Sequence, residues 1–508
     1  MKSLLAAMLA ATLFISACGG GQQEEVTEDA ADASARLAAL FDEHFERNLE
    51  LNPMSATAIG DDRYDDRMAI SMSQEYRDAD RQLDEEFLTR LLEIDRAALE
   101  YQEQLSYDIF RIRREQSLAG NEFPSYLQPM NQFYLMTNFF VQLGSGSSLH
   151  PFKTVKNYDD FLSRADDILV NMDVAVENMK EGMRVGVVQP KILMAKVVPQ
   201  IEAHIVDSAE ESNFWMPITN MPENFSDEDR DRLTAAYKDA IENKFVPAFE
   251  RLNNFIGDTY IGASRETVGL GDQPNGANWY AYMIKVRTTT DMTPDEIHQI
   301  GLDEVARIHG EMRGVMEEVG FEGDLKDFFD FVNTDEQFLF DEPEDLIQGY
   351  RDMSDNITEL AKSLFNVAPK TQFEVRRIEA FREASAAGGS YRFGTPDGSR
   401  PGVFYANAYN IKARPKWAME SLFLHEAIPG HHFQISLQRE NEDLPRFRRF
   451  GGFTAYTEGW GLYAESLGKE LGVYTDPYQY FGALNAELWR AVRLSSAFSA
   501  PKYWNGSV

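Results

Sequence analysis

Apolar residues recur at spacings of three and four over most of the chain, and this pattern most constrains how it can fold. Such a spacing places apolar side chains on one face of an α-helix, and a proline ends the run. The run that ends at Pro53 consists of Leu37, Leu40, Phe41, Phe45 and Leu49. Similar runs occupy residues 156–185, 227–256, 345–364, 416–427 and 476–494. The sequence therefore predicts a mainly α-helical fold.

The clearest helix start lies at residues 293–296, which read Thr-Pro-Asp-Glu. A threonine can cap the first amides, a proline suits the first helical position, and a glutamate three residues after the cap completes a capping box. The apolar residues expected on one face of this helix are Ile297, Ile300, Val305, Ile308 and Met312. We interpret this helix as scaffold.

One segment, residues 386–410, breaks the helical pattern. It contains several glycines, a Pro-Asp-Gly turn and the run Val403-Phe404-Tyr405. These features predict a β-hairpin or small sheet just before the segment that carries three of the eight histidines. An edge strand there could pair with an extended peptide. The alternative is a surface loop packed on the helices.

Composition and charge limit the function classes. The chain has 508 residues, of which 43% are hydrophobic and 26% charged, so it can bury a large core. Its formal net charge of −34 would repel phosphate backbones and anionic lipid surfaces, so we expect no nucleic-acid partner. Residues 34–494 contain no Pro/Ser-rich linker, and we expect one helical domain over residues 35–508, which could have two lobes.

The N-terminus resembles a bacterial lipoprotein signal. Met1-Lys2 is basic, a short apolar run follows to Ile15, and Cys18 is the only cysteine of the chain. The resemblance implies cleavage before Cys18, a lipid on its sulfur, and export. Residues 1–17 would be the signal peptide and residues 18–34 a flexible acidic linker. Gly19 favours the outer membrane, facing the periplasm. The alternative is a buried N-terminal helix with a chance cysteine.

Three of the eight histidines cluster at His425, His431 and His432, and Glu458 and Glu465 follow within TEGWGLYAE. Hydrolysis of an amide at neutral pH needs a polarised carbonyl and a hydroxide-like nucleophile. Zn²⁺ held by two histidines and one carboxylate, with one position open, supplies both. The cluster therefore predicts a zinc site.

The histidine spacing departs from the common HExxH pattern, in which the two histidines lie one helical turn apart. His431 follows His425 by six residues, which is about 240° of rotation on a regular helix, and His432 lies roughly two turns along. Pro429 and Gly430 should open the helix, as if two residues were inserted. We favour His431 as the second ligand and keep His432 as the alternative.

Glu458 is the expected third ligand, and Glu465 lies seven residues on. Two turns place Glu465 on the same helix face, where it could orient a ligand histidine from outside the ligand set. The alternative is a solvated acidic stripe.

Several long motifs resemble the DUF885 family of bacterial proteins. They include NWYAYMIKVRTTTDMTPDEIHQIGLDEVARI, SRPGVFYANAYN, LFLHEAIPGHHFQISLQ and LPRFRRFGGFTAYTEGWGLYAESLG. The resemblance implies a mostly helical, metallopeptidase-like fold, often lipid-anchored, with HE...PGHH in the position of a zinc-peptidase helix. TEGWGLYAE is similar to the glutamate-bearing helix of gluzincin peptidases, which supports Glu458. The family usually continues after RAVRL with a histidine-containing segment that this chain lacks, so we expect the C-terminal end to be incomplete.

The sequence therefore predicts zinc-dependent hydrolysis of peptide bonds in short peptides outside the cytoplasm. Glu426 would act as general base and then as proton donor to the leaving amine. His432 or a tyrosine, either Tyr405 or Tyr456, could stabilise the oxyanion. One alternative is a metal-dependent amidase acting on a cell-wall or other non-peptide amide. The other is a non-catalytic lipoprotein that binds a peptide or protein partner.

Overall fold

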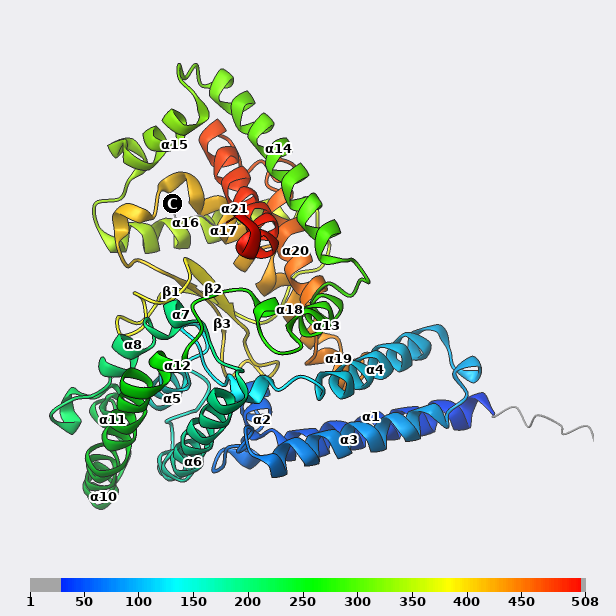
Figure 1. The fold of residues 1–508 in the computed structure, drawn as a ribbon, viewed down its shortest axis with the longest axis vertical. Helices are drawn as coiled ribbons and strands as arrows, with labels where there is room; N and C mark the ends of the chain where they lie inside the picture. The colour runs from blue at the N-terminus through cyan, green and yellow to red at the C-terminus, as the bar shows by residue number, and fades with distance from the viewer. Residues whose placement is uncertain (1–28, 504–508) are drawn as a thin grey trace, which may run out of the picture.

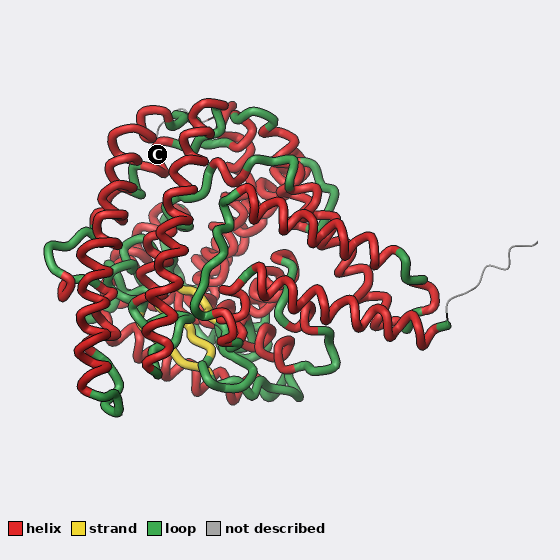
Figure 2. Tube along the Cα trace, turned by 90° about the horizontal axis from the view of Figure 1, so that it is seen from below, coloured by secondary structure: helices red, strands yellow, loops and turns green. Residues whose placement is uncertain are grey.

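The N-terminal helices form a first group that projects as an arm, and the small sheet lies between the second and third groups of helices (Figure 1). The structure is a computed structural model that describes residues 29–503, with side chains to residue 495. Helices make up 66% of the described residues, and they cover most of the trace in Figure 2. This confirms the predicted mainly α fold with a small sheet. None of the described helices is both long and apolar enough to cross a membrane.

The N-terminal helices form the arm and share a core of their own, to which Phe41, Phe87 and Phe110 contribute. These helices are α1 (Ala30–Leu51), α2 (Pro53–Ile59), α3 (Gln74–Leu92) and α4 (Tyr101–Gly120). The arm helix α1 begins before the expected domain start at residue 35, because the Asp29 carboxylate accepts a hydrogen bond from the Ala31 amide. Cys18 and the linker up to residue 28 lie outside the described residues.

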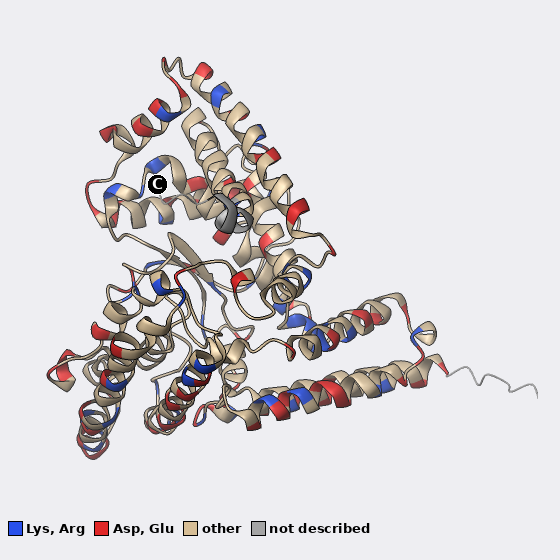
Figure 3. Ribbon diagram, viewed as in Figure 1, with Lys and Arg blue, Asp and Glu red and all other residues tan. Residues whose placement is uncertain are grey.

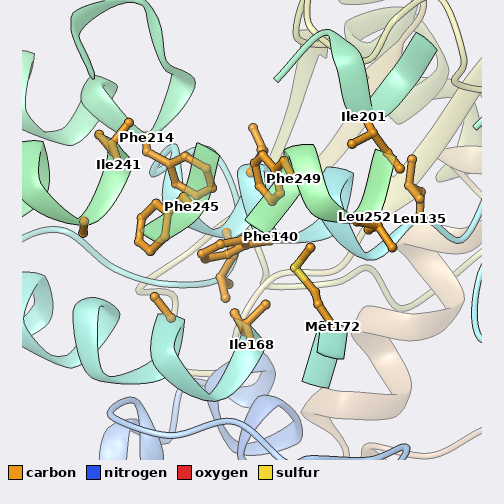
Figure 4. Packing of buried hydrophobic residues seen from close by; sticks show 14 of the residues in the cluster. Leu135, Phe140, Ile168, Met172, Ile201, Phe214, Ile241, Phe245, Phe249 and Leu252 are labelled. Carbon is orange, nitrogen blue, oxygen red and sulfur yellow. The ribbon is translucent and has the colours of Figure 1, made fainter. Parts of the chain in front are cut away.

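The second group packs around a core of aromatic side chains in which Phe140 contacts Phe214, Phe245 and Phe249 (Figure 4). A π-helical turn at Ile241–Phe245 interrupts the helix expected over residues 227–256, and a second one, Phe255–Tyr260, extends it. The α-helices of this group are α5 (Met136–Gly144), α6 (Val155–Val185), α7 (Lys191–Met194), α8 (Val198–Glu202), α9 (Met216–Thr219), α10 (Asp227–Ala240), α11 (Val246–Asn254) and α12 (Ile261–Ala263).

The third group surrounds the histidine segment. Its first helices are α13 (Gly276–Thr288), α14 (Pro294–Glu318), α15 (Leu325–Thr334) and α16 (Pro343–Ala361). After the sheet follow α17 (Met419–Glu426), α18 (His431–Glu440), α19 (Arg446–Arg449), α20 (Thr454–Ser466) and α21 (Pro477–Tyr503). Thr293 caps α14 with the expected capping box. Ile308 and Met312 are buried, but Ile300, expected on the same face, is 43% exposed.

The sheet contains the predicted hairpin and one strand that was not predicted. Its order is β1 (Phe373–Arg377), β3 (Gly402–Ala406), β2 (Gly389–Arg392). The hairpin strands β2 and β3 are antiparallel, whereas β1 pairs with β3 in parallel. Successive side chains of a strand point to opposite faces. Phe404 accordingly packs against α16 and α17, while Tyr405 faces the second group of helices and donates to the Ser147 carbonyl.

The contact between α14 and α21 depends on Gly301. A Cβ atom at this position would lie 2.7 Å from the Ser495 amide nitrogen. Ser495 belongs to α21, so the two helices would have to move apart to make room for the added atom. We expect Gly301→Ala to lower the free energy of unfolding by about 1–3 kcal/mol. Gly310→Ala on the same helix is the control, because nothing lies within 4 Å of its added Cβ. Chemical denaturation of both variants tests this, and equal stability of Gly301→Ala and wild type would contradict it.

Candidate metal centre

The histidine helix is broken at the predicted place. The first half, α17, ends at Glu426 and α18 begins at His431. The Phe433 amide donates to the Ala427 carbonyl at 3.4 Å, a span of six residues rather than the four of an α-helix. Two additional residues are thus accommodated between the helix halves. His431 then lies close to where the second histidine of an unbroken HExxH helix would be.

Two contacts hold this break in place. Gly430 approaches the end of α17 so closely that a Cβ atom would lie 1.9 Å from the His425 carbonyl oxygen. Every other residue type is therefore excluded unless the loop moves. From the neighbouring helix α20, the Trp460 indole N–H donates to the Pro429 carbonyl at 2.7 Å.

Three of the predicted site residues converge. Nε2 of His425 lies 3.5 Å from Oε2 of Glu458, and Nε2 of His431 lies 3.7 Å from the same oxygen. One potential ligand atom from each residue lies within 4.8 Å of the other two. The two imidazole rings are nearly perpendicular, at 81°. Zinc in hydrolases is commonly bound by this set of donors, two imidazole nitrogens and one carboxylate oxygen.

Glu465 orients His425. Its Oε1 lies 2.7 Å from His425 Nδ1, so Nε2 of the ring is directed towards Glu458. The other oxygen of Glu465 accepts hydrogen bonds from Ser421 and Arg490. The predicted orienting role of Glu465 agrees with these contacts, because a ligand histidine commonly donates its second N–H to a carboxylate.

The electrostatics of the two histidines differ. Burial lowers the pKa of His425, but hydrogen bonds to Glu458 and Glu465 outweigh it and raise this pKa to about 9. Burial and the charge of His425 lower the pKa of His431 to about 4. His425 is therefore protonated at neutral pH in the metal-free protein. A metal would have to displace that proton, so we expect metal affinity to increase with pH up to about 9.

Glu426 lies beside the three converging residues. Burial and the nearby Glu458 raise the pKa of its carboxyl, and His425 and a hydrogen bond from the Tyr391 amide partly oppose this, so that the pKa is about 7. Because that amide belongs to the edge strand β2, Glu426 already occupies one of the groups with which an extended peptide could pair.

His432 does not join the cluster. It is 3% exposed, its Nδ1 lies 3.0 Å from the Tyr391 hydroxyl, and its ring packs on Phe373. On α18 the side chain of His432 points about 100° away from that of His431. It is therefore directed towards the sheet, where Phe373 of β1 and Tyr391 of β2 contact it. The expectation that His432 stabilises an oxyanion therefore has no geometric support.

The two tyrosines considered for the same role are also absent from the cluster. Tyr405 is buried on the opposite face of the sheet. Tyr456 is 57% exposed and lines a cavity of 920 Å³ with Trp460 and Phe433. On a regular helix Tyr456 lies about 160° from Glu458, so the two side chains face different sides of α20.

A sequence profile described as "Bacterial protein of unknown function (DUF885)" matches residues 53–496. The chain belongs to this family. The crystal structure of "the putative lipoprotein from Colwellia psychrerythraea" resembles it with 25% identity and a TM-score of 0.81, over 92% of this chain and 83% of that one. A "putative lipoprotein of unknown function from Shewanella oneidensis" has 15% identity and a TM-score of 0.63, over 93% and 83% of the two chains. The latter shows a shared fold alone. No curated protein matches the chain.

Sequence reasoning missed one residue that shapes the site of this DUF885 protein. A Cβ atom on Gly461 would lie 2.6 Å from Cε1 of the His425 ring, so a glycine is needed for the ring to lie against α20. A signal for it was present. Gly461 follows Glu458 by three residues and precedes Glu465 by four, which places it on the helix face of both acids.

Proposed function

We propose that this DUF885 protein is a zinc-dependent peptidase that hydrolyses peptide bonds in short peptides. The observation that carries the proposal is the convergence of His425, His431 and Glu458 across a broken helix. Glu465 supports the proposal, because its hydrogen bond to His425 fixes the orientation of the imidazole ring. A solvated acidic stripe would not bury Glu465 to 6% exposure beneath a histidine.

His425, His431 and Glu458 would hold the zinc ion. When bound, zinc would polarise the substrate carbonyl and acidify a water molecule. Glu426 would accept a proton from the attacking water and later donate it to the leaving amine. Its pKa of about 7 suits both steps, since the carboxyl can gain and lose a proton near neutral pH. Glu458 is 55% exposed on its side chain, so substrate could approach from solvent.

We also propose that the protein is exported and anchored by a lipid on Cys18, at the outer membrane and facing the periplasm. The signal-like N-terminus supports this. So does the similarity to a protein described as a "putative lipoprotein".

The metal content of the purified chain tests the site. Elemental analysis should find about one zinc per chain in the wild type, and none in His425→Ala or Glu458→Ala, because a site left with two ligands binds zinc weakly. Glu470→Ala, an exposed acid shortly after α20, is the matched control and should retain zinc. Unchanged zinc in either ligand variant would contradict the assignment. No zinc in the wild type would favour a non-catalytic binding protein.

A substrate panel then separates peptidase from amidase activity. Wild-type protein loaded with zinc should cleave short unmodified peptides faster than muropeptides or acylated amino acids. Activity on the latter classes alone would identify the alternative, a metal-dependent amidase. Comparison of a short peptide with a folded protein tests the expected preference for small substrates.

A further inference from the structure

A second, polar cavity lies on the face of the sheet opposite the candidate zinc site. Its volume is 1100 Å³, and its walls come from α2, the loop after α5, the start of α6 and the sheet. Arg392 of β2 and Arg400, shortly before β3, both line it. Because Tyr391 and Arg392 are successive residues of one strand, their side chains point to opposite faces. The Tyr391 side chain contacts His432, and Arg392 therefore points away from the zinc site.

The two guanidinium groups have carbonyl partners but no carboxylate partner. Arg392 Nη1 donates to the Ser147 carbonyl at 2.7 Å, and Arg400 Nη2 donates to the Ala58 carbonyl at 2.7 Å. Nε of each side chain is buried with no hydrogen-bond partner. Among the described residues, no carboxylate lies within 4.0 Å of either group. Burial lowers the pKa of both arginines, and the charge of Arg392 lowers the pKa of Arg400 further.

The acidic residues around this cavity are largely committed elsewhere. Asp61 binds Arg63, Asp65 binds the fully buried Arg164, and Asp160 binds Lys156. Asp397 accepts hydrogen bonds from the amide and hydroxyl of Ser399. Asp397 still attracts Arg400, but from beyond ion-pair distance. Acidic and basic residues are spread over the helices (Figure 3). In a chain of net charge −34, two guanidinium groups that line one cavity without a carboxylate partner are unexpected.

The loop after α5 adds neutral hydrogen-bonding groups to the same cavity. Ser145, Ser147 and Ser148 all line it, and the hydroxyls of Ser145 and Ser147 lie 2.8 Å apart. Hydroxyl groups beside two guanidinium groups are suited to bind an oxyanion, because arginine binds carboxylate and phosphate through paired N–H donors.

We propose that this cavity binds a small molecule through a carboxylate or phosphate group, with Arg392 and Arg400 as its cationic contacts. Asp397 attracts Arg400 and Glu379 attracts Arg392, but neither carboxylate lies at ion-pair distance. Holding two partly buried positive charges without a close counter-charge is unfavourable, and a bound oxyanion lowers that cost. The inference does not depend on the zinc site or on the proposed peptidase activity, since none of the residues involved belongs to them.

Titration calorimetry on the full chain tests the proposal, with inorganic phosphate and succinate as separate probes. We expect saturable binding of at least one probe to the wild type. Arg392→Gln and Arg400→Gln should each weaken that binding at least tenfold. Arg184→Gln, an exposed arginine paired with Glu181 on α6, is the control and should bind as the wild type does. The probe that binds identifies the anion as a phosphate or a carboxylate.

A second pair of variants leaves both arginines in place, so that their hydrogen bonds to the Ser147 and Ala58 carbonyls are kept. Ser148→Asp places a competing carboxylate in the cavity and should abolish binding, whereas the neutral isostere Ser148→Asn should retain it. Circular dichroism confirms that each variant is folded. The proposal is overturned if neither probe binds the wild type at millimolar concentration. It is equally overturned if Ser148→Asp and both arginine variants bind as tightly as the wild type.

Discussion

Glu426→Gln is expected to abolish peptide hydrolysis while the zinc content stays at the wild-type level. The glutamine side chain cannot accept the proton of the attacking water, and loss of a positioned general base costs roughly 10²–10⁴-fold in rate. Zinc should remain, because Glu426 is not among the three converging residues proposed as ligands. The measurement is kcat/KM on a short peptide together with elemental analysis of the same preparation.

The pH dependence of peptide hydrolysis tests the same role of Glu426 in a second way. General-base catalysis needs the ionised carboxylate, and burial raises the pKa of Glu426 to about 7. Activity of the wild type should therefore rise with pH through a midpoint at or below 7, since a bound cation favours the ionised form. Residual activity of Glu426→Gln should lack that rise.

Glu420→Gln is the matched control for both measurements. Glu420 lies on the same helix, α17, and burial also raises its pKa to about 7. Its carboxylate accepts a hydrogen bond from Gln479 and takes no part in the cluster. The control should keep its activity and its pH profile. Full activity in Glu426→Gln, or an equal loss in Glu420→Gln, would remove Glu426 from the mechanism.

The helical part of the fold could be predicted because its signals are local. The capping box at Thr293 and the periodic runs depend on residues within a few positions of one another, and the structure has helices in each of these places. The hairpin was equally local, with a turn between its strands. β1 could not be found this way, because its parallel partner β3 lies beyond the hairpin turn and only tertiary structure brings the two together.

In the candidate site, too, the features that depend on neighbouring residues could be predicted and those that depend on tertiary structure could not. The helix break could be derived from Pro429 and Gly430, since it follows from backbone chemistry at two positions. The position of His432 could not be predicted, because the direction of its side chain depends on how far α18 is rotated after the break. The hydrogen bond from the Tyr391 amide to Glu426 could not be predicted either, since it joins β2 and the end of α17, which lie 35 residues apart in the sequence with β3 between them.

Gly461→Ala should greatly reduce zinc binding without unfolding the protein. The added Cβ would lie 2.6 to 2.9 Å from three atoms of the His425 ring, so the ring must move. Moving it would also strain the bond to Glu465 that directs Nε2 towards Glu458. Because disturbing such a supporting contact typically costs 10–100-fold in metal affinity, direct displacement of a ligand should cost at least about 100-fold.

The same helix offers a control that separates this effect from helix propensity. Gly459 lies two residues earlier on α20, and a Cβ atom there would have nothing within 4 Å. Gly459→Ala should therefore keep wild-type zinc affinity and be slightly more stable, by about 0.5–1 kcal/mol. Competition with a zinc-binding dye measures both variants. If Gly461→Ala binds zinc as tightly as Gly459→Ala, His425 does not hold the metal in the orientation that α20 imposes.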